Sequence, residues 1–334
     1  MKQDYLLEID KLNVSFWTEQ GRLTAVDDAS FYIKQGETLG VVGESGCGKS
    51  VTAESILKLH DELLTDYEGS IKYKGDNLLQ ISEKKLRNIR GNEISMIFQD
   101  PMSSLNPVYT IGNQIIESLM LHKKMSKKAA FQEAIDVLRK TGIPSPEQRI
   151  HDYPHQLSGG MRQRVMIALA ICCEPSLLIA DEPTTALDVT IQAQILEVLK
   201  ELQQRTEMGV LMITHDLAVV AETCDRVVVM YLGQVIEETT VHNLFKEPLH
   251  PYTIGLLKSM PNMQSNRSEK LFEINGSVPS LKQIPIGCRF AGRCAFATEK
   301  CLSDAPVLEK ARDGHQVRCW HYEEIATQRG MAYV

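Results

Sequence analysis

The chain has 334 residues, 43% of them hydrophobic, and carries a formal net charge of −7 at pH 7 with a pI near 5.8. This length and apolar content suit a main domain plus an appendage. Because the net charge is negative, the chain lacks the excess of positive charge that binds the phosphate backbone of nucleic acids, so we expect no nucleic-acid partner. No run approaches the roughly 18 apolar residues of a membrane-spanning helix, and the residues after Met1 lack a signal peptide's apolar region, so we expect a cytosolic chain.

The first elements are strands that lead into a glycine-rich turn. Apolar and polar residues mix at short spacing over residues 5–14 and 28–33, which predicts antiparallel strands. The apolar run Thr38–Val42 predicts a buried strand, and a helical pattern covers Lys49–Leu59. Strand, turn and helix in this order frame a phosphate-binding loop.

Helices and strands then alternate, which makes the fold class α/β. Helical periodicity covers residues 126–141 and 158–173, whereas Leu177–Ala180 and Val210–Ile213 are apolar runs typical of buried parallel strands. After about residue 260 the pattern loosens into Pro-, Ser- and Asn-containing sequence typical of a linker. We therefore predict a main domain over 1–260 and a small cysteine-rich C-terminal extension over 261–334.

Residues Gly43–Ser50 match the phosphate-loop pattern G-x-x-x-x-G-K-[ST]. The glycines let successive backbone N–H groups converge on phosphate oxygens at a helix N-terminus. We expect Lys49 to reach the β- and γ-phosphates of ATP and Ser50 to bind Mg²⁺. A chance glycine turn is the ordinary alternative, and the flanking strand and helix argue against it. The predicted nucleotide contacts of this segment are Gly43, Ser45, Gly46, Cys47, Gly48, Lys49, Ser50 and Val51.

The Cys47 thiol within this loop has two interpretations. In the simpler one the backbone of Cys47 matters and the thiol does not. In the other the thiol is open to alkylation, which would block nucleotide binding.

Two acidic residues, Asp181 and Glu182, follow the apolar run that ends at Ala180. Ligands bind at the carboxyl ends of strands in open parallel sheets. We expect Asp181 to hold Mg²⁺ through water and Glu182 to polarise the attacking water as a general base. Acidic residues at a strand end are often only solvated or cap a helix, so the pair is a strong signal only together with the lysine loop.

The segment Leu157–Met161 reads Leu-Ser-Gly-Gly-Met, is followed by Arg-Gln-Arg, and resembles the signature motif of ATP-binding-cassette proteins. Met161 stands at a position where glutamine is more usual in that motif. The resemblance implies a P-loop NTPase (RecA-like) core with an antiparallel β subdomain and a helical subdomain over about 100–170. It also implies that Ser158, Gly159 and Gly160 bind the γ-phosphate of a nucleotide held by the opposite subunit. An ordinary serine N-cap is the alternative.

Other family positions match in chain order. The resemblance implies that Gln99 touches Mg²⁺ and the attacking water, that Asp188 lines the dimer interface, and that His215 holds the γ-phosphate. Phe16 occupies the position where the family stacks an aromatic ring on adenine. Trp17 is the alternative for that role, and simple strand packing is the ordinary one.

Two further segments resemble the ATPases of dipeptide and oligopeptide importers: Phe98–Pro107 and His250–Thr253, the latter followed by Leu256, Leu257 and Pro261. The resemblance implies ATP-driven peptide import at the cytoplasmic face of the inner or plasma membrane. The expected partners are two integral membrane permease subunits, a second cassette ATPase that forms a heterodimer with this chain, and, indirectly, an external peptide-binding protein. Related subfamilies carry nickel or antimicrobial peptides, so the motifs leave the cargo open.

Two rival functions are less favoured. Soluble cassette proteins of DNA repair or translation normally contain two cassettes or a long coiled-coil insertion, whereas this chain has one motif set and no sustained heptads. A regulatory module that binds ATP without hydrolysing it is the second rival. The intact Glu182 and His215 argue against it.

Four of the eight cysteines, Cys288, Cys294, Cys301 and Cys319, are separated by 5, 6 and 17 residues near the C-terminus. Disulfides are disfavoured in the cytosol, so this clustering suggests a thiolate-bound metal centre. Zinc prefers C-x₂₋₄-C pairs, which are missing here, and the wider loops favour an iron–sulfur cluster such as [4Fe–4S]. The resemblance points the same way, since some peptide-importer ATPases carry such a cluster. Zn²⁺ and four unligated cysteines are the alternatives.

The expected role of a cluster is structural or redox-sensing, since ATP hydrolysis needs no electron transfer. We therefore expect the loss of one cysteine ligand to leave nucleotide binding at Lys49 largely intact.

Overall fold

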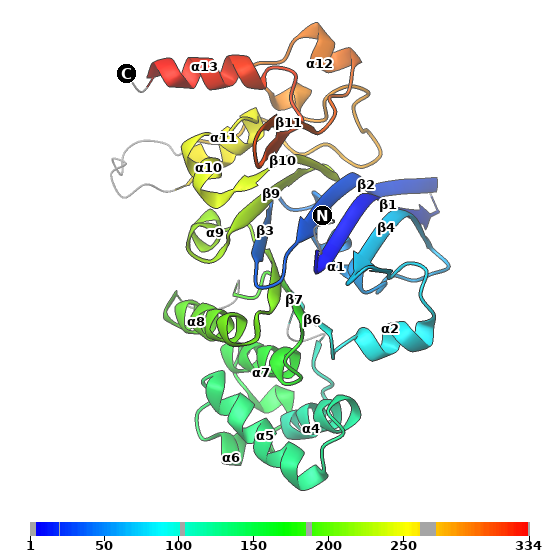
Figure 1. Ribbon diagram of the computed structural model, residues 1–334, viewed down its shortest axis with the longest axis vertical. Coiled ribbons are helices and arrows are strands. Elements are labelled where there is room, and N and C mark those ends of the chain that lie inside the picture. The colour runs from blue at the N-terminus through cyan, green and yellow to red at the C-terminus, as the bar shows by residue number, and fades with distance from the viewer. Residues whose placement is uncertain (1–4, 20, 101–103, 185–188, 261–271, 333–334) are drawn as a thin grey trace. The chain divides into compact units, whose positions relative to one another are not determined.

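Buried apolar strands form the centre of each of two units into which the chain divides. The computed structural model describes residues 5–19, 21–100, 104–184, 189–260 and 272–332 (Figure 1). The first unit, called here the helical unit, comprises the described parts of residues 5–7, 32–38 and 72–213. The second, called the phosphate-loop unit, comprises those of 8–31, 39–71 and 214–332.

Three parallel strands form the sheet of the helical unit: β6 (Ile94–Ile97), β7 (Leu177–Asp181) and β8 (Gly209–Ile213). They lie in the order β8-β7-β6. Every residue of the three strands is buried. Strands covered on both faces have continuous apolar sequences, which is why the runs Leu177–Ala180 and Val210–Ile213 predicted β7 and β8 correctly.

The helices of this unit start at polar caps. Thr110, Ser126 and Ser158 each accept a hydrogen bond from a backbone N–H three residues further on, the usual way to satisfy a helix N-terminus. Figure 1 shows α4 to α7 gathered together. The bounds of the helices are α2 (Glu83–Ile89), α4 (Ile111–His122), α5 (Lys127–Lys140), α6 (Pro146–Arg149), α7 (Gly159–Ile171) and α8 (Val189–Thr206). The predicted helices over 126–141 and 158–173 are α5 and α7.

The phosphate-loop unit has a mixed sheet. Its strands are β3 (Thr38–Val42), β9 (Arg226–Tyr231), β10 (Gln234–Thr240), β12 (His315–Val317) and β11 (Glu309–Arg312), and they neighbour one another in the order β11-β12-β10-β9-β3. β3 and β9 are parallel, whereas β10, β12 and β11 pair antiparallel. Because β12 pairs with β10, the segment after the predicted linker adds strands to this sheet.

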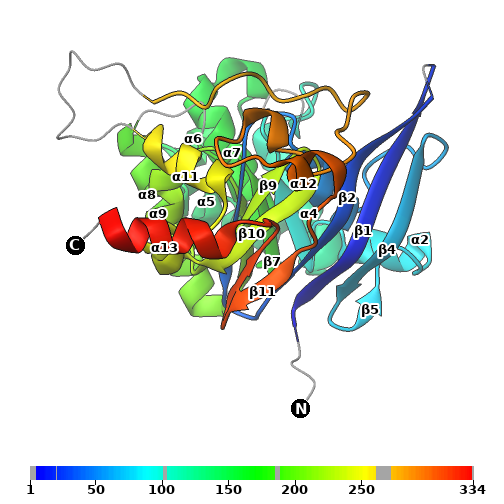
Figure 2. The same cartoon turned by 90° about the horizontal axis from the view of Figure 1, so that it is seen from above.

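A second sheet contains β1 (Leu7–Thr18), β2 (Gly21–Ile33) and β4 (Thr65–Tyr73), in the order β2-β1-β4-β5, with β5 covering Asp76–Asn77. Figure 2 shows β1, β2 and β4 side by side. The first two strands are longer than the predicted 5–14 and 28–33. Their facing ends carry half-buried and exposed residues, so the apolar pattern ends before the hydrogen-bonded strand does.

Helix α1 (Lys49–Ile56) ends earlier than the predicted Leu59. Lys58 adopts a left-handed conformation with φ of 48°. The N–H of Lys58 donates to Ser55 O and that of Leu59 donates to Glu54 O, which are the two bonds of a Schellman C-cap. The sequence did not predict this helix end, because lysine occupies the position that glycine usually takes.

The other helices of this unit are α9 (Leu217–Thr223), α10 (Val241–Lys246), α11 (Pro251–Lys258), α12 (Glu299–Ser303) and α13 (Tyr322–Ala332). Pro251 occupies the first turn of α11, because a helix start needs no N–H there. The aromatic rings of Tyr231, Tyr252 and Phe290 pack together with centroids 4.8 to 5.4 Å apart. They join β9, α11 and the C-terminal segment in one apolar cluster.

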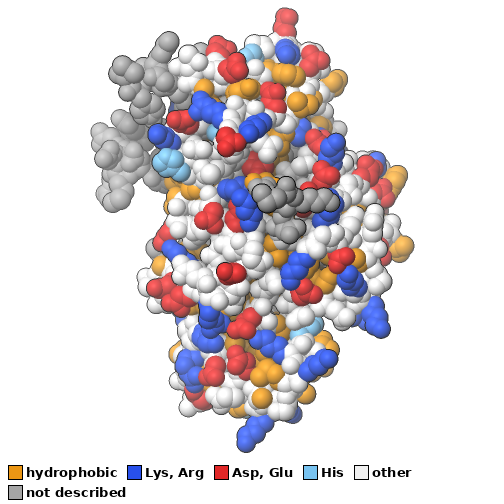
Figure 3. All heavy atoms as spheres, in the orientation of Figure 1, with side chains coloured by type: hydrophobic (Ala, Val, Ile, Leu, Met, Phe, Trp, Pro, Cys, Tyr) orange, Lys and Arg blue, Asp and Glu red, His pale blue; other side chains and the backbone are white. Residues whose placement is uncertain are grey.

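On the face drawn in Figure 3, acidic and basic side chains are interspersed. Among the helices of the described residues, none is long and apolar enough to cross a membrane.

A buried carboxylate joins β10 to the C-terminal segment. Glu237 is fully buried and accepts hydrogen bonds from the backbone N–H groups of Leu249 at 2.7 Å and His250 at 3.0 Å. Its Oε1 also lies 2.8 Å from Nε2 of His315, which is 2% exposed. Three partners from two segments, residues 249–250 and His315, therefore depend on one side chain.

We predict that Glu237→Ala lowers the unfolding free energy by about 3 kcal/mol or more, because it leaves buried N–H groups without an acceptor. Glu237→Gln should cost less, since its amide keeps one acceptor oxygen. Thermal and urea unfolding of both variants would measure the effect, with the exposed Glu309→Gln as control. Equal stability of Glu237→Ala and Glu309→Gln would contradict this role.

Candidate functional site

The phosphate loop connects β3 to α1 through a backbone that approaches its neighbours very closely. Gly43 has a φ of 155°, and a Cβ there would lie 2.3 Å from Met230 O. Gly48 has a φ of 97°, and a Cβ there would lie 2.7 Å from Ala25 O. Both positions therefore require glycine, which explains two of the fixed positions of the motif.

The Lys49 side chain folds back over this loop. It is 7% exposed, and its Nζ donates to Gly43 O at 2.7 Å and to Glu44 O at 3.1 Å. Ser45 and Gly46 are exposed at the tip of the loop, and Ser50 and Val51 are half-buried in the first turn of α1. The first turn of α1 carries no acidic residue, so its N-terminus can attract an anion.

Cys47 does not have the accessible thiol that alkylation requires. The residue is completely buried, and burial raises the pKa of the thiol against the lowering effect of Lys49. Its backbone carbonyl accepts a hydrogen bond from Gly233 N at 2.9 Å. The interpretation in which only the backbone matters is therefore favoured, because a buried, protonated thiol is a poor nucleophile.

In the helical unit, the structure brings together Glu182 and Gln99. Asp181 is the last residue of β7 and is 3% exposed, and Glu182 follows it. The Gln99 amide donates to Glu182 Oε2 at 2.9 Å. Glu182 has a φ of 48°, a conformation that costs energy for a residue with a Cβ and is common at functional sites. The backbone thus turns sharply at Glu182, directly after β7 ends at Asp181.

The signature segment opens helix α7 of the same unit. Ser158 is exposed and is the N-cap of α7, with its Oγ accepting from Met161 N at 3.3 Å. Gly159 is exposed as well. Further along α7, Gln163 is fully buried and its amide donates to the carbonyl of Pro183, so this helix is attached to the segment that carries Glu182. The ordinary N-cap reading of Ser158 is confirmed, and its contact with a nucleotide stays a prediction.

His215 and Phe16 lie in the phosphate-loop unit with the loop itself. His215 is exposed just after Thr214, whose backbone N–H donates to Val41 O of β3 at 3.3 Å. The half-buried Phe16 ring lies edge-on to His60 with centroids 5.0 Å apart. Trp17 is 51% exposed, and its indole donates to Asp66 at 2.9 Å. Of the predicted site residues, Asp188 lies outside the described residues.

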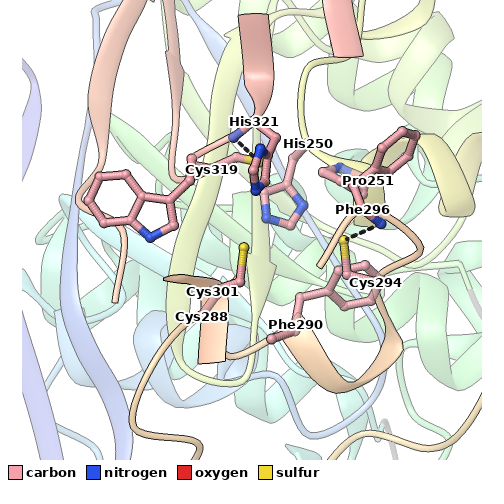
Figure 4. Close-up of a pocket in the computed structure, with 11 residues that line it drawn as sticks. His250, Pro251, Cys288, Phe290, Cys294, Phe296, Cys301, Cys319 and His321 are labelled. Carbon is pink, nitrogen blue, oxygen red and sulfur yellow. Dashed lines mark hydrogen bonds between the residues drawn. The ribbon is translucent and has the colours of Figure 1, made fainter. Parts of the chain in front are cut away.

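Four cysteines line one pocket in the C-terminal segment, with Cys294 and Cys301 drawn around it in Figure 4. The other walls of the pocket include His250, Phe290, Phe296 and His321. The two remaining cysteines are Cys288 and Cys319. In the part of the chain that the structure describes, no group of three or more His, Cys, Asp or Glu side chains is arranged to hold a metal ion.

Backbone donors and burial shape the chemistry of these thiols. Cys294 Sγ accepts from Phe296 N at 3.3 Å, and Cys319 Sγ accepts from His321 N at 3.4 Å. Burial, with a smaller contribution from the neighbouring thiols, raises the pKa of Cys294 to about 11 and that of Cys319 to about 12, against the lowering effect of the backbone N–H groups. Such thiols ionise readily only beside a cation, which is the environment that an iron–sulfur cluster supplies. Four cysteine thiols lining one pocket are the type of donor that iron–sulfur clusters use.

Sequence reasoning missed a set of ion pairs between the C-terminal segment and the phosphate-loop region. The pairs are Arg289 with Asp27, Arg293 with Glu44 and Arg318 with Asp28. Each arginine is the sequence neighbour of a pocket cysteine. That adjacency was the available signal, but the acidic partners are more than 240 residues away in the sequence.

Comparisons with known proteins agree with the motifs. A family model described as ABC transporter matches residues 26–185, and one described as oligopeptide/dipeptide transporter, C-terminal region, matches residues 236–301. The dimeric, post-hydrolysis structure of the ATP-binding cassette MJ0796 bound to ADP and Pi superposes with a TM-score of 0.64 and 26% identity, over 70% of this chain and 98% of that one.

Relatives match over nearly the full length. The oligopeptide transport ATP-binding protein AppD of Bacillus subtilis is 53% identical over 325 residues, 97% of this chain and 99% of the relative. The dipeptide transport ATP-binding protein DppD of Escherichia coli is 50% identical over 317 residues, 95% of this chain and 96% of the relative. The chain therefore belongs to the ATP-binding-cassette family, within its group of dipeptide and oligopeptide transport ATP-binding proteins.

Proposed function

We propose that this chain binds Mg²⁺–ATP at the phosphate loop and hydrolyses it to drive the import of dipeptides or oligopeptides. The observation that carries the hydrolytic part is the Glu182 carboxylate, which follows a buried parallel strand and accepts a hydrogen bond from Gln99. The transport of peptides follows from the relatives, whose names describe them as peptide transport proteins. Nickel and antimicrobial peptides are the alternative cargoes.

The roles of individual residues divide between phosphate binding and catalysis. Lys49 neutralises the β- and γ-phosphates, while Ser50 and Asp181 hold Mg²⁺, which withdraws charge from the phosphate oxygens. Glu182 accepts a proton from the attacking water, and Gln99 orients that water and contacts Mg²⁺. His215 holds the γ-phosphate, and Phe16 stacks on adenine.

A dimer completes the site in this proposal. Ser158 and the Gly159 and Gly160 amides bind the γ-phosphate of a nucleotide held by the second subunit, and Asp188 lines the interface between the two subunits. The solved cassette that this chain resembles is itself described as dimeric. The second subunit is a different cassette ATPase, and the pair acts on two membrane permease subunits from the cytoplasmic face. The helical subdomain, about residues 100–170, receives a permease helix, so that closure on ATP moves the permease.

The cysteine pocket of the C-terminal extension, residues 261–334, binds a [4Fe–4S] cluster in this proposal. Support comes from four thiols around one pocket, two of which accept backbone N–H bonds. Cys288, Cys294, Cys301 and Cys319 would hold it, and the cluster would cross-link the loops that carry them. Zn²⁺ and four unligated cysteines are the alternatives.

We predict different effects for two substitutions in the ATP site. Lys49→Ala should weaken both ATP binding and turnover, because phosphate charge loses its counterion. Glu182→Gln should retain ATP binding but lower turnover about a hundredfold or more, because the water loses its base. ATP-binding titrations and single-turnover assays would measure both, with the exposed Glu201→Gln as control. Substantial turnover by purified Glu182→Gln would remove Glu182 as the base.

We predict that hydrolysis requires two chains, because Lys49 and Ser158 of one protomer serve different nucleotides. The specific ATPase activity of the isolated chain should be low and should rise with protein concentration and with addition of its partner subunits. Size-exclusion chromatography with light scattering would establish the oligomeric state of each sample. If demonstrably monomeric protein hydrolyses ATP as fast as the assembled transporter, the shared-site proposal is wrong.

We predict that protein purified without oxygen is brown and contains about four irons and four sulfides per chain. Cys301→Ser should lose both the iron and the visible absorbance, whereas Cys224→Ser, outside the pocket, should keep them. Iron and sulfide assays and absorption spectra would measure this. Colourless anaerobic protein, with stoichiometric zinc or without metal, would overturn the cluster.

A further inference from the structure

The Arg293 side chain is fixed by several contacts at once. Its guanidinium binds both oxygens of Glu44, with Nη1 and Nη2 at 2.7 and 3.0 Å from Oε2 and Oε1. Its Nε donates to Asn275 O at 2.9 Å, and Nη1 lies 3.4 Å from the Tyr231 hydroxyl. The side chain is only 6% exposed. Such a two-point arginine–carboxylate pair fixes orientation as well as charge.

Glu44 is itself part of the phosphate loop. Its backbone carbonyl accepts from Lys49 Nζ at 3.1 Å, and its N–H donates to the Tyr252 hydroxyl at 2.8 Å. A carboxylate within a loop that binds phosphate would repel the ligand unless a cation neutralised it. Arg293 supplies that cation from the C-terminal segment.

A second arginine contacts the turn at Leu232 and Gly233, which is hydrogen-bonded to the phosphate loop. Arg289 pairs with Asp27 and donates to the carbonyl of Leu232. The next residue, Gly233, donates its N–H to Cys47 O of the phosphate loop at 2.9 Å. Two arginines that flank pocket cysteines therefore contact the loop or the turn that supports it.

We propose that Arg293 is a positioning residue of the nucleotide site and that it couples the cysteine pocket to the phosphate loop. Cys294 follows Arg293 directly, so a change in the pocket moves the guanidinium away from Glu44. The uncompensated Glu44 carboxylate then weakens ATP binding. This inference rests on the proposed binding of ATP to the loop. It differs from the expectation, drawn from the sequence, that loss of one cysteine leaves nucleotide binding at Lys49 largely intact.

The first test measures the Kd for a fluorescent ATP analogue, with Mg²⁺, on the full chain. Arg293→Gln should weaken binding about tenfold, and more at low salt, because a negative charge is left beside the phosphates. Arg293→Lys, which keeps the charge, should restore most of the affinity. The double variant Arg293→Gln with Glu44→Gln should do the same. Arg22→Gln, which breaks an exposed ion pair, is the matched control.

The outcomes separate this inference from the proposed function. A natural protein that does not bind the analogue would contradict ATP binding itself. If the natural protein binds and Arg293→Gln equals it, or if the double variant is as weak as Arg293→Gln, only the role of Arg293 is overturned. Should Arg293→Gln fail to fold, Arg293→Lys and the double variant still test the role of Arg293. Both remove the two-point pair, but the lysine keeps a cation beside Glu44 and the double variant removes the Glu44 carboxylate. Weak binding by both would contradict a charge-based role.

The second test concerns the coupling to the pocket. Cys294→Ser should weaken binding of the analogue several-fold in the natural background. The same substitution should have little effect in the Arg293→Gln and Glu44→Gln double variant, because the charge that transmits the change is missing. An equal loss in both backgrounds, or no loss in the natural one, would overturn the coupling.

Discussion

The phosphate loop depends on the close approach of its backbone to neighbouring segments. Gly43 lies against the carbonyl of Met230, Gly48 lies against that of Ala25, and Cys47 O accepts the N–H of Gly233. These contacts hold the loop open toward solvent while Lys49 is buried against its carbonyl groups. Any side chain at either glycine would push the loop away from the segments that support it.

Local chemistry explains which features could be predicted from the sequence. The strand Thr38–Val42, the caps at Ser126 and Ser158, and the helix start at Pro251 follow from rules that act over a few residues. The motif identified the phosphate loop because Gly43 and Gly48 have positive φ angles, a local requirement that favours glycine. The family followed from the order of the motifs, and the full-length relatives bear it out.

Other features could not be predicted because their causes are distant in the sequence or unusual in type. Helix α1 ends at a Schellman turn in which lysine takes the usual place of glycine. The pair between Arg293 and Glu44 spans 249 residues, and the sequence has many arginines and glutamates that could form other pairs. The clustering of the cysteines indicated a shared site. Only the fold indicates which residues surround that site, and that arginines next to its cysteines contact the phosphate loop or the adjoining turn.

The pairing of β10 with β12 has a consequence for how the cassette can be divided. In the sheet of the phosphate-loop unit, β10 has β9 on one side and β12 on the other. A chain truncated near residue 260, where the composition changes, would keep β10 but lose β12. Its outer row of N–H and C=O groups would become an open template for strands of other molecules. Pairing with β12 therefore covers an edge of β10 that would otherwise be open.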